Sequence, residues 1–312
     1  MARSDFDSVA VIVVNYGSSS LLELHLLALS ECAPGLTVVV VDNFSSSQEC
    51  ERVTALCHAR GWIAELCERN DGFGAGMNIG VALARTRGAS LFLLLNPDAV
   101  LTADGLTALV AEVSADPLLL ASPTILRPDG SVWFGGADLS LEDGRVSARG
   151  RRSPSLLRLE PWLSGACLVV SAELWDLVGG FADEYFLYWE DIDLSHRVLA
   201  AGGRLEVFSS ATSVHAEGGT QGVDSQASGT PKSTLYYYYN IRNRLVFAAR
   251  HLSVADVRRW RRIAPRVAWE VLLEGGRRQL LRSPRPALAA ARGLRDGLRL
   301  SRRGNSTRKD PA

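Results

Sequence analysis

The run Leu91-Phe92-Leu93-Leu94-Leu95-Asn96-Pro97-Asp98 limits what this chain can fold into. Five bulky apolar residues in succession predict a strand that is buried on both faces, which is typical of a central strand in a parallel sheet. Proline lacks the backbone N–H that a ladder needs, so we expect the strand to end before Pro97. Asn96 and Asp98 are then expected at the carboxyl edge of the sheet, where open α/β folds bind ligands and where a carboxylate suits a divalent cation. The alternative interpretation is a turn in which Asp98 caps the next helix.

Strand-like and helix-like segments alternate along the first third of the chain, joined by short connections. The predicted strands are 9–14, 37–41, 62–67 and 91–95, and the predicted helices are 21–29, 47–60, 78–86 and 106–113. This alternation predicts an α/β fold with a mostly parallel sheet that is flanked by helices. Further along, we expect a strand over 167–170, helices over 172–178 and 191–201, and a glycine- and serine-rich loop over 209–231.

The charges of the chain are segregated, although its formal net charge is zero. The segment 250–312 holds 17 Lys and Arg against 5 Asp and Glu, whereas the remaining 249 residues hold 17 against 29. We therefore predict a main α/β domain over 1–249 and a basic helical extension over 250–312, with the last dozen residues disordered. An acidic body with a basic extension indicates that the extension contacts an anionic surface.

The five cysteines show no CxxC spacing, which favours reduced thiols in a cytoplasmic protein over a disulfide framework or a zinc site. The N-terminus has no basic segment followed by an apolar stretch, so we expect no signal peptide. No window of 18 continuous apolar residues occurs, so no membrane-spanning helix is predicted.

Two further motifs fall at predicted strand ends. Asp42 follows the second strand as Asp98 follows the fourth, and it could either bind a ligand or cap a helix. The segment from Asn70 to Asn78 is rich in glycine and leads into a helix, an arrangement that lets backbone N–H groups approach phosphate. It also resembles a dinucleotide-binding fingerprint, but Gly72, Gly74, Gly76 and Gly80 do not give the GxGxxG spacing.

Three carboxylates, Glu190, Asp191 and Asp193, follow a row of aromatic residues that includes Tyr188 and Trp189. Neighbouring carboxylates that are partly buried have raised pKa values, which suits a general base, and aromatic faces suit sugar rings, so we predict that Tyr188 and Trp189 bind an acceptor. The alternative is an acidic helix start that complements the helix dipole. His215 becomes a candidate metal ligand only if the fold brings it to Asp98.

In this order, these segments resemble family 2 glycosyltransferases of the GT-A fold, and in particular the bacterial rhamnosyltransferase-like branch. The resemblance covers about 9–247 and is carried by these stretches: Val13-Val14-Asn15-Tyr16, Val41-Asp42-Asn43, Asn70 through Asn78, Leu95-Asn96-Pro97-Asp98, Trp189-Glu190-Asp191, and His215 with the glycines after it.

The resemblance implies a role for each matching residue. Asp42 would contact the nucleotide base with the Asn15-Tyr16 turn alongside it, and the segment holding Asn70, Gly72, Gly74 and Asn78 would line the nucleotide-sugar pocket. Asp98 matches the second aspartate of the family's DxD metal motif, Asn96 stands at the first position, and His215 would complete the coordination of Mg²⁺ or Mn²⁺. Asp191 matches the catalytic base, with Glu190 the second choice.

The resemblance further implies an inverting transfer from a nucleotide-diphospho-sugar to a glycan or lipid-linked acceptor in cell-envelope polysaccharide synthesis. Arg258-Arg259-Trp260-Arg261-Arg262 and Trp269 lie among apolar residues, so we expect 250–303 to contact an anionic membrane at its cytoplasmic face rather than nucleic acid. Two rival functions stay open: a nucleotidyltransferase that makes nucleotide-sugars, and a non-catalytic glycan-binding relative suggested by Asn96.

Overall fold

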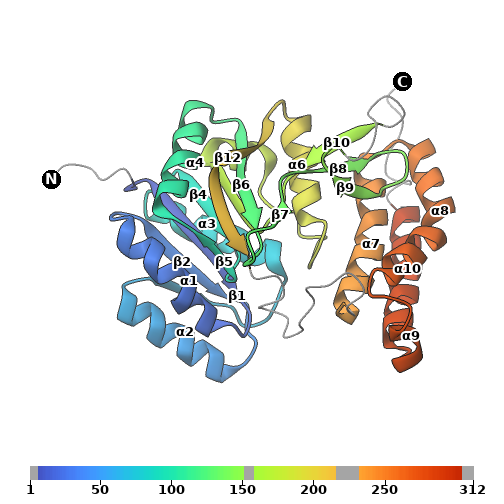
Figure 1. Cartoon of the computed structure of the whole chain (residues 1–312), viewed down its shortest axis with the longest axis horizontal. Helices are drawn as coiled ribbons and strands as arrows, with labels where there is room; N and C mark the ends of the chain where they lie inside the picture. The colour runs from blue at the N-terminus through green and yellow to red at the C-terminus, as the bar shows by residue number, and fades with distance from the viewer. Residues whose placement is uncertain (1–5, 151–157, 216–231, 304–312) are drawn as a thin grey trace. The chain divides into compact units, whose positions relative to one another are not determined.

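The computed structural model describes residues 6–150, 158–215 and 232–303 (Figure 1). The chain forms two compact units, each built from separate stretches of sequence. The first unit takes the described residues of Met1–Ala137, Pro161–Phe186 and Glu190–Thr220. The second takes those of Asp138–Glu160, Leu187–Trp189 and Gln221–Ala312.

A central sheet organises the first unit. Among the described residues it has nine strands in the order β3-β2-β1-β4-β11-β6-β12-β5, with β7 paired to β6. Their bounds are β1 (Val9–Asn15), β2 (Thr37–Asp42), β3 (Ile63–Leu66), β4 (Leu91–Leu95), β5 (Ala99–Leu101), β6 (Leu119–Leu126), β7 (Val132–Phe134), β11 (Cys167–Ser171) and β12 (Arg204–His215). The half β3-β2-β1-β4 is parallel, so the carboxyl ends of these strands lie at one edge.

Helices of the first unit pack against this sheet, for example α3 against β1 and β2 (Figure 1). Their bounds are α1 (Ser19–Cys32), α2 (Ser47–Arg60), α3 (Phe73–Thr86), α4 (Ala103–Ala115), α5 (Ala172–Val178) and α6 (Glu190–Ala200). Hydroxyl side chains set several helix starts. Ser46, Thr102 and Ser171 each accept a hydrogen bond from a backbone N–H in the first turn of α2, α4 and α5.

The predicted α/β fold of GT-A type is confirmed, and the strand over 91–95 ends as predicted, but several local expectations were wrong. β11 pairs antiparallel with β4 and β6, β12 pairs antiparallel with β5, and β6 pairs antiparallel with β7, so the sheet is more mixed than predicted. α3 begins at Phe73 rather than at Asn78. β12 runs through 209–215, which we expected to be loop; residues 216–231 of that prediction lie outside the described residues.

The second unit contains most of a small three-stranded sheet and a group of helices (Figure 1). Their bounds are β8 (Ala137–Ser140), β9 (Val146–Ala148), β10 (Leu159–Trp162), α7 (Thr234–His251), α8 (Val254–Leu273), α9 (Gln279–Arg282) and α10 (Arg285–Arg303). α7 packs against both α8 and α10. α7 continues through the predicted domain boundary at 249, and the predicted disordered end, from 304, lies outside the described residues.

Aromatic side chains form the centre of the second unit. Trp260 of α8 is fully buried, and its ring contacts the rings of Trp189 and Phe247 at centroid distances of 6.4 and 6.1 Å. The guanidinium of Arg244 lies 4.5 Å from the centre of the Trp260 ring, and burial lowers the pKa of Arg244 to about 9. Trp260 also donates from Nε1 to the backbone oxygen of Leu141 at 3.0 Å, which ties α8 to the segment after β8.

In the part of the chain that the structure describes, we find no helix whose length and apolar character would let it cross a bilayer.

Candidate functional site

Asn15 and Asp42 meet at the carboxyl edge of the sheet. They end the adjacent strands β1 and β2, stand opposite each other in the register, and are both fully buried. Asn15 Nδ2 donates to Asp42 Oδ1 at 2.6 Å, and the thiol of Cys50 donates to Asp42 Oδ2 at 3.1 Å. Each carboxylate oxygen has a second lone pair, so Asp42 has acceptor capacity beyond these two hydrogen bonds.

Glu49 is a residue of this site that the sequence reasoning missed. It is buried in the first turn of α2, and its Oε1 accepts from Asn15 Nδ2 at 3.1 Å and from the backbone N–H of Ser19 at 2.7 Å. The other end of the Asn15 amide accepts from the backbone N–H of Ser18 at 3.1 Å. These contacts fix the orientation of Asn15. The pattern Ser46-x-x-Glu49 was a visible signal, but it predicts only a helix cap.

Two exposed aromatic side chains follow these strand ends. Tyr16 comes directly after Asn15 and is 50% exposed, and Phe44 comes two residues after Asp42 and is 40% exposed. Phe44 has a φ of 46°, which is a left-handed conformation that non-glycine residues rarely adopt. Exposed rings beside polar groups are suited to stacking on a planar ligand. Tyr16 was predicted from the sequence to lie beside the nucleotide, but Phe44 was not, because its only signal is its place two residues after Asp42.

Two contacts hold the end of β4 in place. The N–H of Asn96 donates to the carbonyl of Ala166 at 2.9 Å, and His25 of α1 contacts the Pro97 carbonyl through Nδ1 at 2.8 Å. Because that carbonyl can only accept, His25 Nδ1 must carry the proton. Asp98 is 3% exposed. No local pattern in the sequence could have identified His25, because it lies 72 residues from Pro97 along the chain.

The structure brings His215 to Asp98, as the metal hypothesis requires. His215 ends β12 and pairs with Ala99 of β5, and its Nε2 lies 3.0 Å from Asp98 Oδ1. That contact is at an ion-pair distance but lacks hydrogen-bond geometry, so Asp98 Oδ1 is a buried atom with no hydrogen-bond partner among the described residues. The Asn96 amide lies 3.5 Å from the same His215 nitrogen.

These residues fit a divalent cation that is shared with a substrate. Carboxylate oxygen and imidazole nitrogen are common ligands of Mn²⁺, and Asp98 Oδ1 is a buried acceptor that needs a partner. The described part of the chain has no group of three or more His, Cys, Asp and Glu side chains placed to hold a metal alone. Two protein ligands leave coordination positions for diphosphate oxygens and water.

Asp191 and Glu190 begin α6, and their environments differ. Glu190 is buried with its Oε2 unpartnered among the described residues, and burial with the nearby Asp191 charge raises the pKa of Glu190 well above its usual range. Asp191 keeps part of its surface open to solvent. Loss of hydration raises the pKa of Asp191 to about 6, opposed by hydrogen bonds from the N–H groups of Gly165 at 3.1 Å and Ile192 at 2.9 Å. Of the two, Asp191 is the accessible carboxylate.

The glycines of the 70–80 segment serve close packing. A Cβ at Gly72, where φ is 101°, would collide with the backbone oxygen of Phe186, and a Cβ at Gly74 would lie 2.8 Å from the Phe181 Cβ. Asn70 Oδ1 accepts from the N–H of Gly72 at 2.9 Å and shapes the turn before α3. This packing explains the glycines without a ligand, and the predicted donor contacts of Asn70, Gly72 and Gly74 stay predictions.

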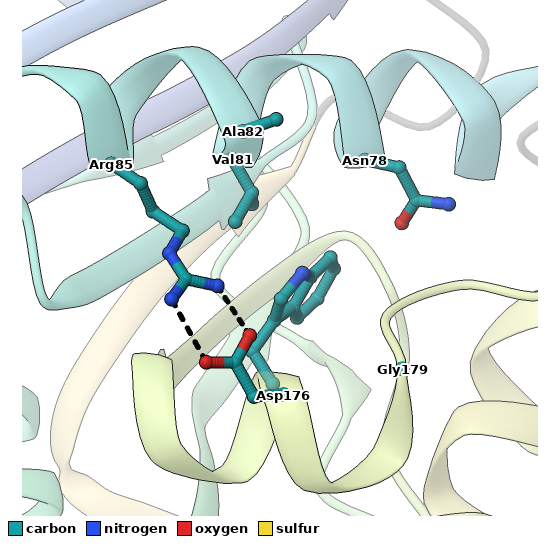
Figure 2. Close-up of a pocket in the computed structure, with 7 residues that line it drawn as sticks. Asn78, Val81, Ala82, Arg85, Asp176 and Gly179 are labelled. Atoms are coloured by element: carbon teal, nitrogen blue, oxygen red, sulfur yellow. Dashed lines mark hydrogen bonds and ion pairs between the residues drawn. The ribbon is translucent and has the colours of Figure 1, made fainter.

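Asn78 is committed to a structural contact. Its amide nitrogen donates to the carbonyl of Phe181 at 2.8 Å, and its amide oxygen accepts from the Phe181 N–H at 2.9 Å. It lines a pocket of about 410 Å³ between α3 and α5, where Figure 2 shows Arg85 paired with Asp176. That pocket has none of the sheet-edge carboxylates among its lining residues, so we place the candidate site at the sheet edge instead.

Tyr188 and Trp189 belong to the second unit. Both have positive φ values, 65° and 77°, which are strained for residues with side chains. Asn243 of α7 donates from Nδ2 to the carbonyls of Leu187 at 3.0 Å and Tyr188 at 2.7 Å. Trp189 is 5% exposed, and its packing accounts for it without an acceptor; acceptor binding by the half-buried Tyr188 stays a prediction.

Comparison with known proteins gives a family and several named relatives, of which two are described. The sequence model of glycosyl transferase family 2 matches residues 8–162. The chain is 32% identical over 164 residues to the N-acetylglucosaminyl-diphospho-decaprenol L-rhamnosyltransferase of Mycobacterium tuberculosis H37Rv, covering 46% of this chain and 53% of that protein. It is 23% identical over 228 residues to rhamnosyltransferase WbbL of Escherichia coli K12, covering 66% and 83%. The chain thus spans only about half the length of the mycobacterial relative.

Solved structures of low sequence identity share the fold. GalNAc-T7 with UDP, GalNAc and Mn²⁺ superposes with a TM-score of 0.59 at 14% identity, covering 94% of this chain and 55% of that one. The mannosyltransferase PcManGT of Pyrobaculum calidifontis, with GDP-Man and Mn²⁺, gives 0.53 at 18% identity and covers 99% and 92%. The chain therefore belongs, through residues 8–162, to glycosyl transferase family 2, and it is similar to the rhamnosyltransferase-like branch of that family.

Proposed function

We propose that this protein is an inverting glycosyltransferase that moves a sugar from a nucleotide-diphospho-sugar to a hydroxyl of a glycan or lipid-linked acceptor in cell-envelope polysaccharide synthesis. The observation that carries the proposal is a junction in the first unit. The Asn96 N–H donates to the Ala166 carbonyl, and the adjacent Gly165 N–H donates to the Asp191 carboxylate. The strand end that leads to Asp98 and the candidate base are thus fixed by neighbouring residues of one segment.

The two rhamnosyltransferase relatives support rhamnose as the first sugar to test. The name of the mycobacterial relative includes a decaprenol carrier, which supports a lipid-linked acceptor. The GalNAc-T7 and PcManGT structures hold nucleotide compounds and Mn²⁺, which supports a nucleotide-sugar donor and a divalent cation in general.

In the proposed reaction Asp191 takes the proton of the acceptor hydroxyl as that oxygen attacks the anomeric carbon. The new carbon–oxygen bond forms as the bond from the anomeric carbon to the diphosphate oxygen breaks, and the nucleoside diphosphate leaves with its electron pair. Attack from the opposite face inverts the anomeric configuration. A general base contributes about 10²–10⁴-fold to such a step. Gly165 and Ile192 orient the carboxylate through their N–H groups.

On the donor side, Asp42 would accept a hydrogen bond from the nucleotide, while Asn15 holds the Asp42 carboxylate in place. Tyr16 and Phe44 offer exposed rings for stacking on the base. Asp98 and His215 would hold the divalent cation, which when bound neutralises charge on the diphosphate leaving group.

Thermal shift and transfer assays with three variants test this proposal. A donor at about 100 times its Kd stabilises the folded state by about 2.7 kcal/mol, which raises Tm by about 5–10 °C for a domain of this size. We expect dTDP-rhamnose with Mn²⁺ to raise Tm more than UDP- and GDP-sugars do. Asp98→Ala should lose the part of this rise in Tm that depends on Mn²⁺. Asp191→Asn should keep the full rise in Tm but no longer transfer sugar to the acceptor. Asp104→Ala, which removes an exposed carboxylate of α4, is the matched control.

The rival functions give different results in these assays. No stabilisation by any nucleotide-sugar, together with no release of nucleoside diphosphate, would favour a glycan-binding protein. Release of pyrophosphate from a nucleoside triphosphate and a sugar phosphate would favour the nucleotidyltransferase.

A further inference from the structure

The outer face of α9 and α10 in the second unit is lined by arginines. These side chains and two leucines are exposed, and we call the set the α9–α10 face: Arg277, Arg278, Leu281, Arg282, Arg285, Leu288, Arg292, Arg295, Arg299 and Arg302. On α10 the members recur every three or four residues, so they share one side of the helix. Figure 1 shows α9 beside one end of α10, and the two helices are in contact.

The opposite side of α10 explains why this face points outward. Gly293 and Gly297 are buried there, in line with Ala290 and Ser301. A Cβ at Gly293 would collide with the backbone oxygen of Tyr238 in α7, and a Cβ at Gly297 would lie 3.0 Å from the backbone oxygen of Arg242. Small residues let the two helix backbones approach closely, and this close packing fixes α10 in rotation. The arginine side is therefore held away from α7.

The charge of this segment is unbalanced. Residues 277–303 contain nine arginines and one acidic residue, Asp296. Asp296 is already used, because it pairs with Arg295 at 2.9 Å and accepts from the Tyr238 hydroxyl at 3.1 Å. Within the ranges that the structure describes, no other arginine of the α9–α10 face has an ion-pair partner. The other arginines of this face are therefore available to bind an external anion.

The two leucines indicate what kind of anion. Leu281 is 89% exposed and Leu288 is 54% exposed, each with arginines close by in the sequence. A polyanion such as nucleic acid offers phosphates to the arginines but little for exposed aliphatic groups to bury against, whereas the boundary of a bilayer accepts both. Arginine also suits this boundary, since its long stem can lie along apolar groups while its guanidinium binds lipid phosphate.

We propose that the α9–α10 face docks on an anionic membrane surface, with Leu281 and Leu288 entering the headgroup region. Its use in bringing a lipid-linked acceptor to the enzyme rests on the proposed function, whereas the docking itself does not. The contact differs from the one expected from the sequence around Arg258–Arg262. There Trp260 is fully buried, Arg259 pairs with Glu142 and Asp256, and Arg261 donates to the backbone of Leu298.

Vesicle co-sedimentation of the full chain tests the proposal without any sugar substrate. The vesicles are phosphatidylcholine with or without phosphatidylglycerol. Because each arginine near an anionic surface contributes about fivefold to partitioning, Arg285→Gln/Arg292→Gln/Arg299→Gln should bind phosphatidylglycerol vesicles about 100-fold more weakly. Leu281→Ser/Leu288→Ser should weaken binding about tenfold. Neither variant alters a buried side chain, and thermal melting checks that each is folded.

Matched controls come from exposed residues of the first unit. Arg60→Gln/Arg87→Gln/Arg204→Gln makes the same change in net charge, and Leu24→Ser/Leu177→Ser makes the same change in exposed leucine. Both controls should bind as the unchanged chain does. If the arginine control loses as much vesicle binding as the triple variant of the α9–α10 face, net charge alone is responsible and the proposal is overturned. It is also overturned if the arginine triple variant binds unchanged, or if the leucine variant binds unchanged while a single-stranded oligonucleotide competes the vesicles off.

Discussion

Acidification should slow the proposed transfer reaction well above the pH at which an ordinary aspartate takes up a proton. The reason is the environment of Asp191, whose loss of hydration raises its pKa to about 6 in spite of the N–H groups of Gly165 and Ile192. A general base works only in its ionised form. The ionised fraction of Asp191 therefore sets the rate on the acid side of the pH profile.

The size of the effect follows from the pKa. With a pKa of about 6, Asp191 is about nine-tenths ionised at pH 7 and about one-tenth ionised at pH 5, so the rate should fall about tenfold between these values. An aspartate with the reference pKa of about 3.9 would still be about nine-tenths ionised at pH 5, and the rate would hardly change.

The assay is release of nucleoside diphosphate at saturating donor and acceptor between pH 4.5 and 8. Glu190→Gln is the control, because Gln resembles the protonated carboxyl group that burial favours at Glu190, and the shift at Asp191 arises mainly from its own burial. This variant should keep a midpoint near pH 6. Asp191→Asn should lower the rate of nucleoside diphosphate release about 10²–10⁴-fold at every pH. A flat profile from pH 5 to 7, or an Asp191→Asn variant with the activity of the unchanged chain, would show that Asp191 is not the general base.

Two further predictions concern stability. Glu190 keeps its proton to a higher pH in the folded than in the unfolded state, so its contribution to stability is lost as the pH rises above its unfolded-state pKa of about 4.3. Glu190→Gln should therefore raise the free energy of unfolding at pH 7 but not at pH 4, as measured by urea titration at both pH values. Asn243→Ala should lower the free energy of unfolding by about 2–4 kcal/mol, because two carbonyls of the strained turn at Tyr188 lose their donor. Asn243→Asp, which keeps the shape but buries a carboxylate beside the same two carbonyl oxygens, should lose at least as much. A variant as stable as the unchanged chain contradicts the role of Asn243.

Local patterns in the sequence were sufficient for the parallel half of the sheet and for several helix starts. The apolar run of β4 and the β-branched runs of β1 and β2 are buried on both faces, so composition alone identifies them. Strand direction is not encoded in such a pattern, which is why the antiparallel pairing of β11 was missed. Residues 209–215 of β12 were predicted as loop because short polar residues interrupt the alternation there, at the point where the register shifts between Phe208 and Thr212.

The candidate site was predictable only where its residues follow strands. Asp42 and Asp98 could be placed because the ends of neighbouring parallel strands meet at one edge. Glu49 and His25 could not, since their parts depend on contacts between segments far apart in the sequence. Trp260 shows the opposite error, because its arginine neighbours suggested a membrane boundary while the fold buries it against Trp189.

The discontinuous make-up of the second unit has a consequence for biosynthesis. Residues made in the middle of the chain contact residues made much later, as when Arg145 pairs with Glu270 at 2.7 Å and Leu141 accepts from Trp260. The segment of β8 and β9 therefore cannot complete these contacts until α8 has been synthesised. The same interleaving means that no single cut or fusion point separates the two units, so the second unit could not have been gained or exchanged as one continuous insertion.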